Sequence, residues 1–303
     1  MDDLAATFAF APIERLHHDR TQRIYYLVNP DTLDTAARFR PAMAYALAHH
    51  FLEAAEAAAR TGDQMLFDWY RSPAASDVFR LHTPTTVGPQ VILAPALSDL
   101  TRSPISDTPY YLIGPDTAPA AEHLRGMTTN AVDEGALAGF GDLLAAHAPV
   151  VCLLRPKNLG DTLDSWTITR LPGSVFVDHI SDASVLGRDL VHEAAHNWLN
   201  DALTACEIKI SAEHQYFSPW KNSPRPALGF LHACWAFPLV MLYTARAAAR
   251  AHGPVRDFLT TYLDHQRAML AATRNDHAHA VALIADDDLR TRLVTVYQAA
   301  RWV

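Results

Sequence analysis

The sequence predicts an α+β protein that is mostly helical, with a small central antiparallel or mixed sheet packed on one buried helix. Three observations favour this fold class. Ala- and Leu-rich segments with helical periodicity occupy both ends of the chain. Short apolar and β-branched runs, at 149–154 and 174–180, lie near the middle. The segment 185–203 is apolar on nearly every side, which is typical of a helix buried in a core.

The N-terminal part, residues 1–130, is predicted to be mainly helical with a loop-rich segment. Residues 41–61 are Ala-rich, begin with Pro and are followed by Gly62, which predicts a helix with a defined start and stop. His49 and His50 lie on it; neighbouring rings on a helix cannot point to one spot, so we expect them to be partly exposed rather than metal ligands. Residues 72–130 mix Pro, Ser, Thr and Asp with short apolar runs, which predicts loops and a few short strands.

The C-terminal part, residues 131–303, is predicted to carry the functional site and is compatible with one continuous domain shared with the first part. Strands are expected at 149–154, 166–170, 174–180 and 206–211. The three prolines in 216–226 make that segment a poor helix or central strand, so it is predicted to be a loop. Helices are expected at 132–147, 227–251, 255–273 and 286–301.

Composition excludes some classes of partner. The chain has 303 residues, of which 50% are hydrophobic and 19% charged, and its net charge is −8. This charge gives no basic field for nucleic acid or an anionic membrane, so we expect neither as a partner. The segment 227–245 is nearly long and apolar enough to span a membrane, but His232 and Pro238 inside it favour a buried core helix.

Cysteine usage predicts a reducing environment. The chain has three cysteines, Cys152, Cys206 and Cys234, each inside an apolar segment. An odd number without close pairing argues against a disulfide framework. The acidic N-terminus also lacks the basic start and long apolar core of a secretory signal. We therefore expect a cytoplasmic protein.

A metal-binding motif lies on the predicted buried helix. His192-Glu193-Ala194-Ala195-His196 places two imidazoles four residues apart, on one face of a helix that starts near Asp182, a good N-cap residue. Two neutral imidazoles can then hold one divalent metal, and Glu193 can reach a water or substrate on it. With 16 histidines in the chain, a chance match is the alternative. The buried, helical context favours a metal site, because buried His and Glu need partners.

A catalytic metal usually needs a third protein ligand. Leu199 and Ala202 stand where a metzincin would have Gly and His, which excludes that class. His232 is the best candidate, because it is nearly alone as a polar group in the most apolar part of the chain; the alternative is a hydrogen-bonded core histidine. The other candidates for the third ligand are His214, Glu207 and Glu213.

The order of short motifs from 174 to 237 resembles a known family. The quoted motifs are His-Glu-Ala-Ala-His-Asn-x-Leu at 192–199, Ser-Pro-Trp at 218–220, Arg-Pro at 225–226, Gly-x-x-His at 229–232 and Ala-Phe at 236–237. Together they resemble the HExxH-motif proteins found beside genes for ribosomal peptide natural products. Family members often have Gly after the third His, where this chain has Ala233.

The resemblance implies an Fe(II)- and α-ketoglutarate-dependent dioxygenase that hydroxylates a β-carbon of a ribosomally synthesised precursor peptide. It implies that His192, His196 and His232 bind the metal, and that the Ser-Pro-Trp and Arg-Pro loop borders the site. A three-ligand facial site would leave positions for the keto acid and dioxygen, although a triad of histidines alone differs from the common two-His-one-carboxylate pattern.

The distal carboxylate of α-ketoglutarate needs a cationic, preferably bidentate partner. Arg225, held between two prolines, is the candidate; Arg170 and Arg188 are alternatives, and Arg225 could equally be a loop-stabilising surface arginine. Glu193 would orient groups or act as a base in hydroxylation. Two other functions stay open. One is an atypical zinc metallopeptidase, in which Zn(II) replaces iron and Glu193 activates water. The other is a non-catalytic helical binding protein with a structural metal.

Overall fold

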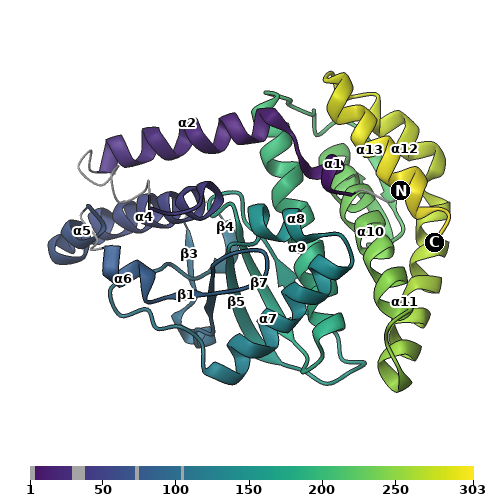
Figure 1. The fold of residues 1–303 in the computed structure, drawn as a ribbon. Coiled ribbons are helices and arrows are strands. Elements are labelled where there is room, and N and C mark those ends of the chain that lie inside the picture. The colour runs from purple at the N-terminus through teal and green to yellow at the C-terminus, as the bar shows by residue number, and fades with distance from the viewer. Residues whose placement is uncertain (1–3, 29–37, 72–74, 104–105) are drawn as a thin grey trace.

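The computed structural model describes residues 4–28, 38–71, 75–103 and 106–303. Helices dominate, and a five-stranded sheet lies between two helical layers (Figure 1). This confirms the predicted α+β class with a small mixed sheet packed on a buried helix. Two smaller sheets have two strands each, β3 with β4 and β8 with β9.

The central sheet has the strand order β1-β2-β5-β7-β6. Its three inner strands are parallel, with Val151 of β5 paired to Ile92 of β2 and to Val175 of β7. The outer strands β1 and β6 are antiparallel to their neighbours. The strands are β1 His82–Thr83, β2 Gln90–Leu93, β3 Thr101–Ser103, β4 Ser106–Tyr110, β5 Val150–Pro156, β6 Ser165–Trp166 and β7 Ser174–His179.

Both faces of the inner strands are covered, which explains why these strands read as continuous apolar runs rather than alternating ones. Successive side chains point to opposite faces. Val151 and Val175 join a cluster with α7 (Glu122–Leu137), α8 (Gly141–His147) and α9 (Ala183–Ala205). Cys152 and Phe176 join a cluster on the other face with α4 (Pro41–Thr61). The α4 bounds equal the predicted ones.

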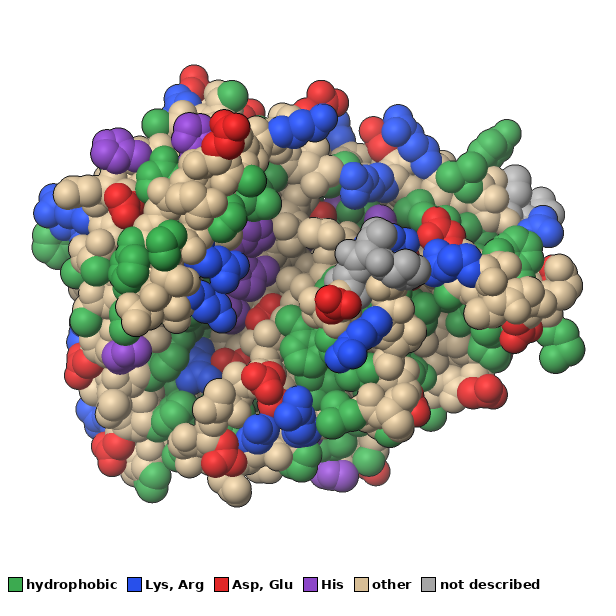
Figure 2. Space-filling view, turned by 180° about the vertical axis from the view of Figure 1, so that it is seen from behind, with side chains coloured by type: hydrophobic (Ala, Val, Ile, Leu, Met, Phe, Trp, Pro, Cys, Tyr) green, Lys and Arg blue, Asp and Glu red, His purple; other side chains and the backbone are tan. Residues whose placement is uncertain are grey.

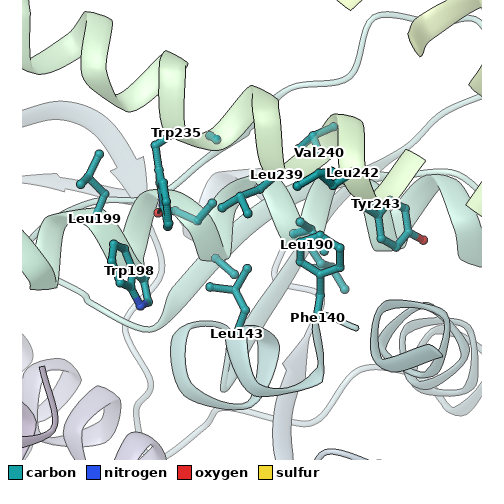
Figure 3. Close-up of a cluster of buried hydrophobic side chains, with 14 of the residues drawn as sticks. Phe140, Leu143, Leu190, Trp198, Leu199, Trp235, Leu239, Val240, Leu242 and Tyr243 are labelled. Carbon is teal, nitrogen blue, oxygen red and sulfur yellow. Dashed lines mark hydrogen bonds between the residues drawn. The ribbon is translucent and has the colours of Figure 1, made fainter. Parts of the chain in front are cut away.

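The helix α9 is the buried helix that the sequence predicts. Asp182 caps its start, because its Oδ1 accepts hydrogen bonds of 3.0 Å from the backbone N–H groups of Ser184 and Val185. Trp198 on α9 is fully buried and stacks on Trp235 of α10 (Ala227–Ala248), with ring centroids 4.6 Å apart. Figure 3 shows these two rings beside apolar side chains of both helices. α9 and α10 therefore meet through large aromatic residues.

α10 is long and apolar enough to cross a membrane by length and composition, but 72% of its most apolar window is buried inside the protein. It packs against α9, α11 and α13. This arrangement supports the interpretation of α10 as a core helix. The remaining helices are α1 Ala5–Phe8, α2 Ala11–Val28, α5 Gln64–Arg71, α6 Ala75–Phe79, η2 Leu97–Asp99, α11 Gly253–Ala272, α12 Arg274–Val281 and α13 Asp287–Ala300.

Four local predictions are wrong or only partly right. The helix expected at 132–147 is two helices, α7 (Glu122–Leu137) and α8 (Gly141–His147). Residues 206–211 form no strand: α9 continues to Ala205, and Ile208 and Ile210 pack on the core without a strand partner. Residues 216–226 are not a loop but a hairpin, β8 (Gln215–Ser218) with β9 (Ser223–Pro226). Prolines are tolerated there because each strand of a two-stranded sheet has one free edge. The strand predicted at 166–170 is only Ser165–Trp166.

Candidate metal centre

The structure brings the three predicted histidine ligands into contact. The Nε2 atoms of His192 and His196, one turn apart on α9, lie 3.1 Å from each other. The Nδ1 atom of His196 lies 3.0 Å from Nδ1 of His232 on α10. The His192 side chain is 19% exposed. Seen from behind, the molecule has a hollow with histidine side chains in its wall and Lys or Arg side chains at its border (Figure 2).

The donor set suits a divalent ion of the transition series. Two nitrogens bound at about 2.1 Å and at a right angle lie about 3 Å apart, which matches the spacing of His192 and His196. His196 directs Nε2 toward His192 and Nδ1 toward His232. One ion bound to all three residues therefore requires an imidazole ring to rotate.

The three imidazoles are held neutral, which is the form that binds metal. Burial lowers the pKa of His192 and of His232 to about 4, and it lowers the pKa of His196 well below the usual value. The positive charges of Arg188 and Lys221 lower the pKa of His192 further.

Glu193 presents one carboxyl oxygen without a partner. Oε1 accepts a 2.6 Å hydrogen bond from the Ser165 hydroxyl on β6 and lies 3.9 Å from Nε2 of His192. Oε2 is buried and has no hydrogen-bond partner. Burial raises the pKa of this carboxyl to about 8, against the Ser165 hydrogen bond, which lowers it. A buried oxygen without a partner, on a carboxyl that lies next to His192, is a group available to a ligand.

Arg225 lies on β9 with its guanidinium against the first turn of α10. A Cβ at Gly229 would be 3.2 Å from Nη2 of Arg225, so the absence of a side chain there lets the guanidinium approach. Gly229 is three residues before His232, on the same side of α10. Within the described residues, Arg225 makes no ion pair or side-chain hydrogen bond. Its charge is therefore free to meet an anion.

The two alternative arginines are engaged elsewhere. Arg170 forms ion pairs with Glu53 and Glu56 of α4. Arg188 is buried, donates from Nε to Oδ1 of Asp189 at 2.8 Å, and lies over the rings of Phe258 and Tyr262. Arg225 is thus the arginine of the three without an acidic partner in the described chain.

The hairpin of β8 and β9 borders the histidines through aromatic contacts. Trp220, in its turn, stacks on Phe237 of α10 with centroids 4.6 Å apart and planes at 5°. The ring of Phe237 lies 4.9 Å from that of His192. The Ser-Pro-Trp segment therefore contacts His192, a candidate metal ligand, through the ring of Phe237.

The other predicted candidates lie apart from this centre. His214, Glu207 and Glu213 are exposed. The expectation for the His49–His50 pair is wrong for His50, which is fully buried. Its Nδ1 accepts from the backbone N–H of Ile113, and its Nε2 lies 2.9 Å from Oγ of Ser174. The ring is a polar link between α4 and β7.

Sequence reasoning missed a second cluster of metal-ligating side chains. His17 of α2, His147 of α8 and Asp201 of α9 are buried, and one potential ligand atom from each lies within 4.8 Å of the others. His17 and Asp201 are 184 positions apart in the chain, so no local spacing signals their meeting.

Comparison with known proteins adds no family to these observations. Among protein-family models none matches this chain, and a search of curated proteins found no match.

Proposed function

We propose that this protein is an Fe(II)- and α-ketoglutarate-dependent dioxygenase that hydroxylates a β-carbon in a ribosomally synthesised precursor peptide. One observation carries the proposal: three partly buried, neutral histidines lie in contact with one another, and the guanidinium of Arg225, a cation without an acidic partner among the described residues, lies against Gly229, three residues before the third histidine. The resemblance of the 174–237 segment to the HExxH-motif peptide hydroxylases supports the same reaction.

In this proposal His192, His196 and His232 hold Fe(II), and Arg225 binds the distal carboxylate of α-ketoglutarate through its two terminal nitrogens. When bound, iron and α-ketoglutarate supply the oxidising chemistry, in which dioxygen is consumed, the keto acid becomes succinate and carbon dioxide, and a C–H bond becomes C–OH. Glu193, whose pKa is raised to about 8, holds a proton at neutral pH and offers it as a hydrogen bond to a ligand beside His192. Trp220 and Phe237 exclude water from one side.

A zinc metallopeptidase is the second candidate. The observation that favours it is the carboxyl of Glu193, which has one oxygen without a partner and the other 3.9 Å from Nε2 of His192, in the motif that hydrolases of this kind use. There Glu193 would accept a proton from water, and Zn(II) would take the place of iron. This function gives no role to the free charge of Arg225.

Metal retention tests the ligand set. Wild type, His196→Ala, His232→Ala and the exposed-histidine control His214→Ala are loaded with Fe(II) without oxygen, desalted, and analysed for iron. We expect the His196 and His232 variants to lose the metal to a similar extent, and His214→Ala to keep it. Full iron occupancy in His232→Ala would place the third ligand elsewhere.

Binding of α-ketoglutarate tests the reaction class without knowledge of the peptide. Calorimetry on Mn(II)-loaded protein is expected to show α-ketoglutarate binding by wild type and by Arg256→Gln, an exposed-arginine control on α11, with affinity at least tenfold weaker in Arg225→Gln. Succinate formation by the Fe(II) protein is the second readout. Zinc-dependent peptide cleavage with no requirement for a keto acid would overturn the dioxygenase proposal in favour of the peptidase.

A further inference from the structure

The cluster of His17, His147 and Asp201 lies at the junction of four helices. His17 comes from α2, His147 from the last residue of α8, Asp201 from α9, and α4 supplies the neighbouring Tyr45. α2 lies above α4 in Figure 1 and packs against both α4 and α9. On α9, Asp201 is five residues after His196 and points to a different side of the helix, because five residues turn the helix by about 500°.

We propose that His17, His147 and Asp201 form a second metal site, which takes a divalent ion of the zinc class and is separate from the His192 centre. Two imidazoles and one carboxylate are the ligands that such an ion prefers. The proposal goes beyond the dioxygenase function and does not depend on it.

The spacing of the donor atoms supports this site. Oδ2 of Asp201 lies 2.8 Å from Nε2 of His17 and 3.4 Å from Nδ1 of His147. Ligands of a tetrahedral zinc ion lie about 3.3 Å apart, so a small outward movement of His17 would admit the ion. His147 Nδ1 is buried and faces Oδ2 of Asp201 in a geometry that does not make a hydrogen bond. A bound ion would satisfy this nitrogen.

Neighbouring groups orient the donors. The Tyr45 hydroxyl donates to Oδ1 of Asp201 at 3.3 Å, which leaves Oδ2 to face the two histidines. The Tyr45 ring stacks on that of His17 at 3.9 Å and 19°. Asn197 donates from Nδ2 to the backbone carbonyl of His147 at 2.8 Å and fixes the end of α8 against α9. Partners that hold ligand side chains in this way are a regular feature of metal sites.

The cluster also has an entry path. A cavity of about 770 Å³ is lined by His17 and His147, together with Phe10, Glu14, Arg40 and Asp142. Three protein ligands leave a fourth tetrahedral position for water or a small ligand, and this cavity is where that position would open.

Zinc stoichiometry tests the proposal. Wild type, His196→Ala/His232→Ala, His147→Gln and the exposed control His265→Gln are equilibrated with excess Zn²⁺, desalted and analysed for bound zinc. We expect two ions per chain in wild type and in His265→Gln, and one in each of the other two proteins. Adding His147→Gln to the double variant should remove the last ion. If the double variant retains no zinc, the second site is refuted. If instead the His192 centre binds no zinc but the second site does, wild type would hold one ion, and His147→Gln would remove it.

A measurement on unaltered protein covers the case in which His147→Gln does not fold. Crystals of wild type grown with Zn²⁺ are measured at the zinc absorption edge. We expect an anomalous peak within bonding distance of Nε2 of His17 and Oδ2 of Asp201. The absence of a peak there, at a zinc concentration that fills other sites, overturns the proposal and leaves the cluster as a hydrogen-bonded core network.

Discussion

The hydroxyl of Ser165 donates a 2.6 Å hydrogen bond to Oε1 of Glu193 and leaves Oε2 of the same carboxyl without a partner. Ser165 belongs to β6, a two-residue edge strand paired with β7 at Val177. The short strand therefore positions a hydroxyl beside the histidines. Oε1 of Glu193 is held by this hydrogen bond, and Oε2 remains available to a ligand.

Replacement of Ser165 should affect turnover more than metal binding. We expect Ser165→Ala to keep its metal and to form succinate about tenfold more slowly at saturating α-ketoglutarate, with an unchanged KM for the keto acid, because loss of an orienting hydrogen bond misplaces Glu193. Ser165→Thr retains a hydroxyl and should recover most of the rate, and Ser98→Ala, at an exposed position, should match wild type. An equal loss in the Thr variant would mean that the hydroxyl is not the group that matters.

Gly187 permits the close approach of α9 to its neighbours. A Cβ at this position would lie 2.4 Å from Oη of Tyr243 on α10 and 2.9 Å from the backbone oxygen of Ala131 on α7. The backbone of α7 cannot move as a side-chain end can, so a methyl group here forces the helices apart. The same contact limits the distance between α9, which carries His192 and His196, and α10, which carries His232.

We expect Gly187→Ala to lower the free energy of unfolding by about 1–3 kcal/mol through overpacking, as measured by urea denaturation. Gly126→Ala is the matched control: Gly126 is exposed on α7 with no atom within 4 Å of the added Cβ. There the better helix propensity of Ala should stabilise the protein by up to about 1 kcal/mol. A Gly187→Ala protein as stable as Gly126→Ala would refute the close contact.

The sequence alone was sufficient to predict features that depend on residues close together in the chain. The bounds of α4 follow from Pro41 at its start and Gly62, with φ of 71°, after its end. The contact of His192 with His196 follows from helical spacing, and His232 was found because a polar ring stands almost alone in an apolar segment. Each of these features could be predicted from residues close to it in the chain.

Other features depend on packing between distant segments. The β8–β9 hairpin has two prolines in one strand, and only the pairing itself shows that they occupy a free edge. Ile208 and Ile210 carry a strand-like pattern, but no strand among the described residues pairs with them, and their side chains pack on the core instead. The cluster of His17, His147 and Asp201 joins three helices, so no sequence window contains it.

The buried His50 makes the fold sensitive to acid. Burial lowers its pKa to about 3, with a smaller effect from His49. Nδ1 accepts from Ile113, so Nε2 carries the proton and donates to Ser174. The unfolded chain binds a proton near pH 6.5 and the folded protein does not, so this contribution to stability is complete above that pH and is lost as the pH falls toward 3.

His50→Gln should therefore reduce the loss of stability between pH 7 and pH 5. The expected difference from wild type over this range is about 2 kcal/mol, because an unfolded histidine gains that much from protonation at pH 5. Urea denaturation at the two pH values measures it, and the difference between proteins cancels the effect of other buried histidines. His18→Gln, at an exposed position, should follow wild type. Identical pH dependence in His50→Gln would show that the ring is protonated inside the fold.

Trp235 links the two helices that carry the candidate ligands. Its Nε1 donates to the backbone carbonyl of Ala195 at 3.0 Å, directly before His196, and its ring stacks on Trp198. His232 lies three residues before it, on the same side of α10. This hydrogen bond therefore fixes the separation of His196 and His232 from the core side.

Trp235→Phe removes the donor and part of the ring while it keeps an aromatic group in the core. We expect a loss of about 1–3 kcal/mol in the free energy of unfolding. We also expect a several-fold weaker affinity for Fe(II) in competition with a chelating dye, because α10 gains freedom relative to α9. Trp302→Phe, at a side chain that is 87% exposed, should change neither quantity. If Trp235→Phe lowers stability but binds Fe(II) as wild type does, the spacing of the histidines is set by other contacts, of which the Gly187–Tyr243 approach is the next to test.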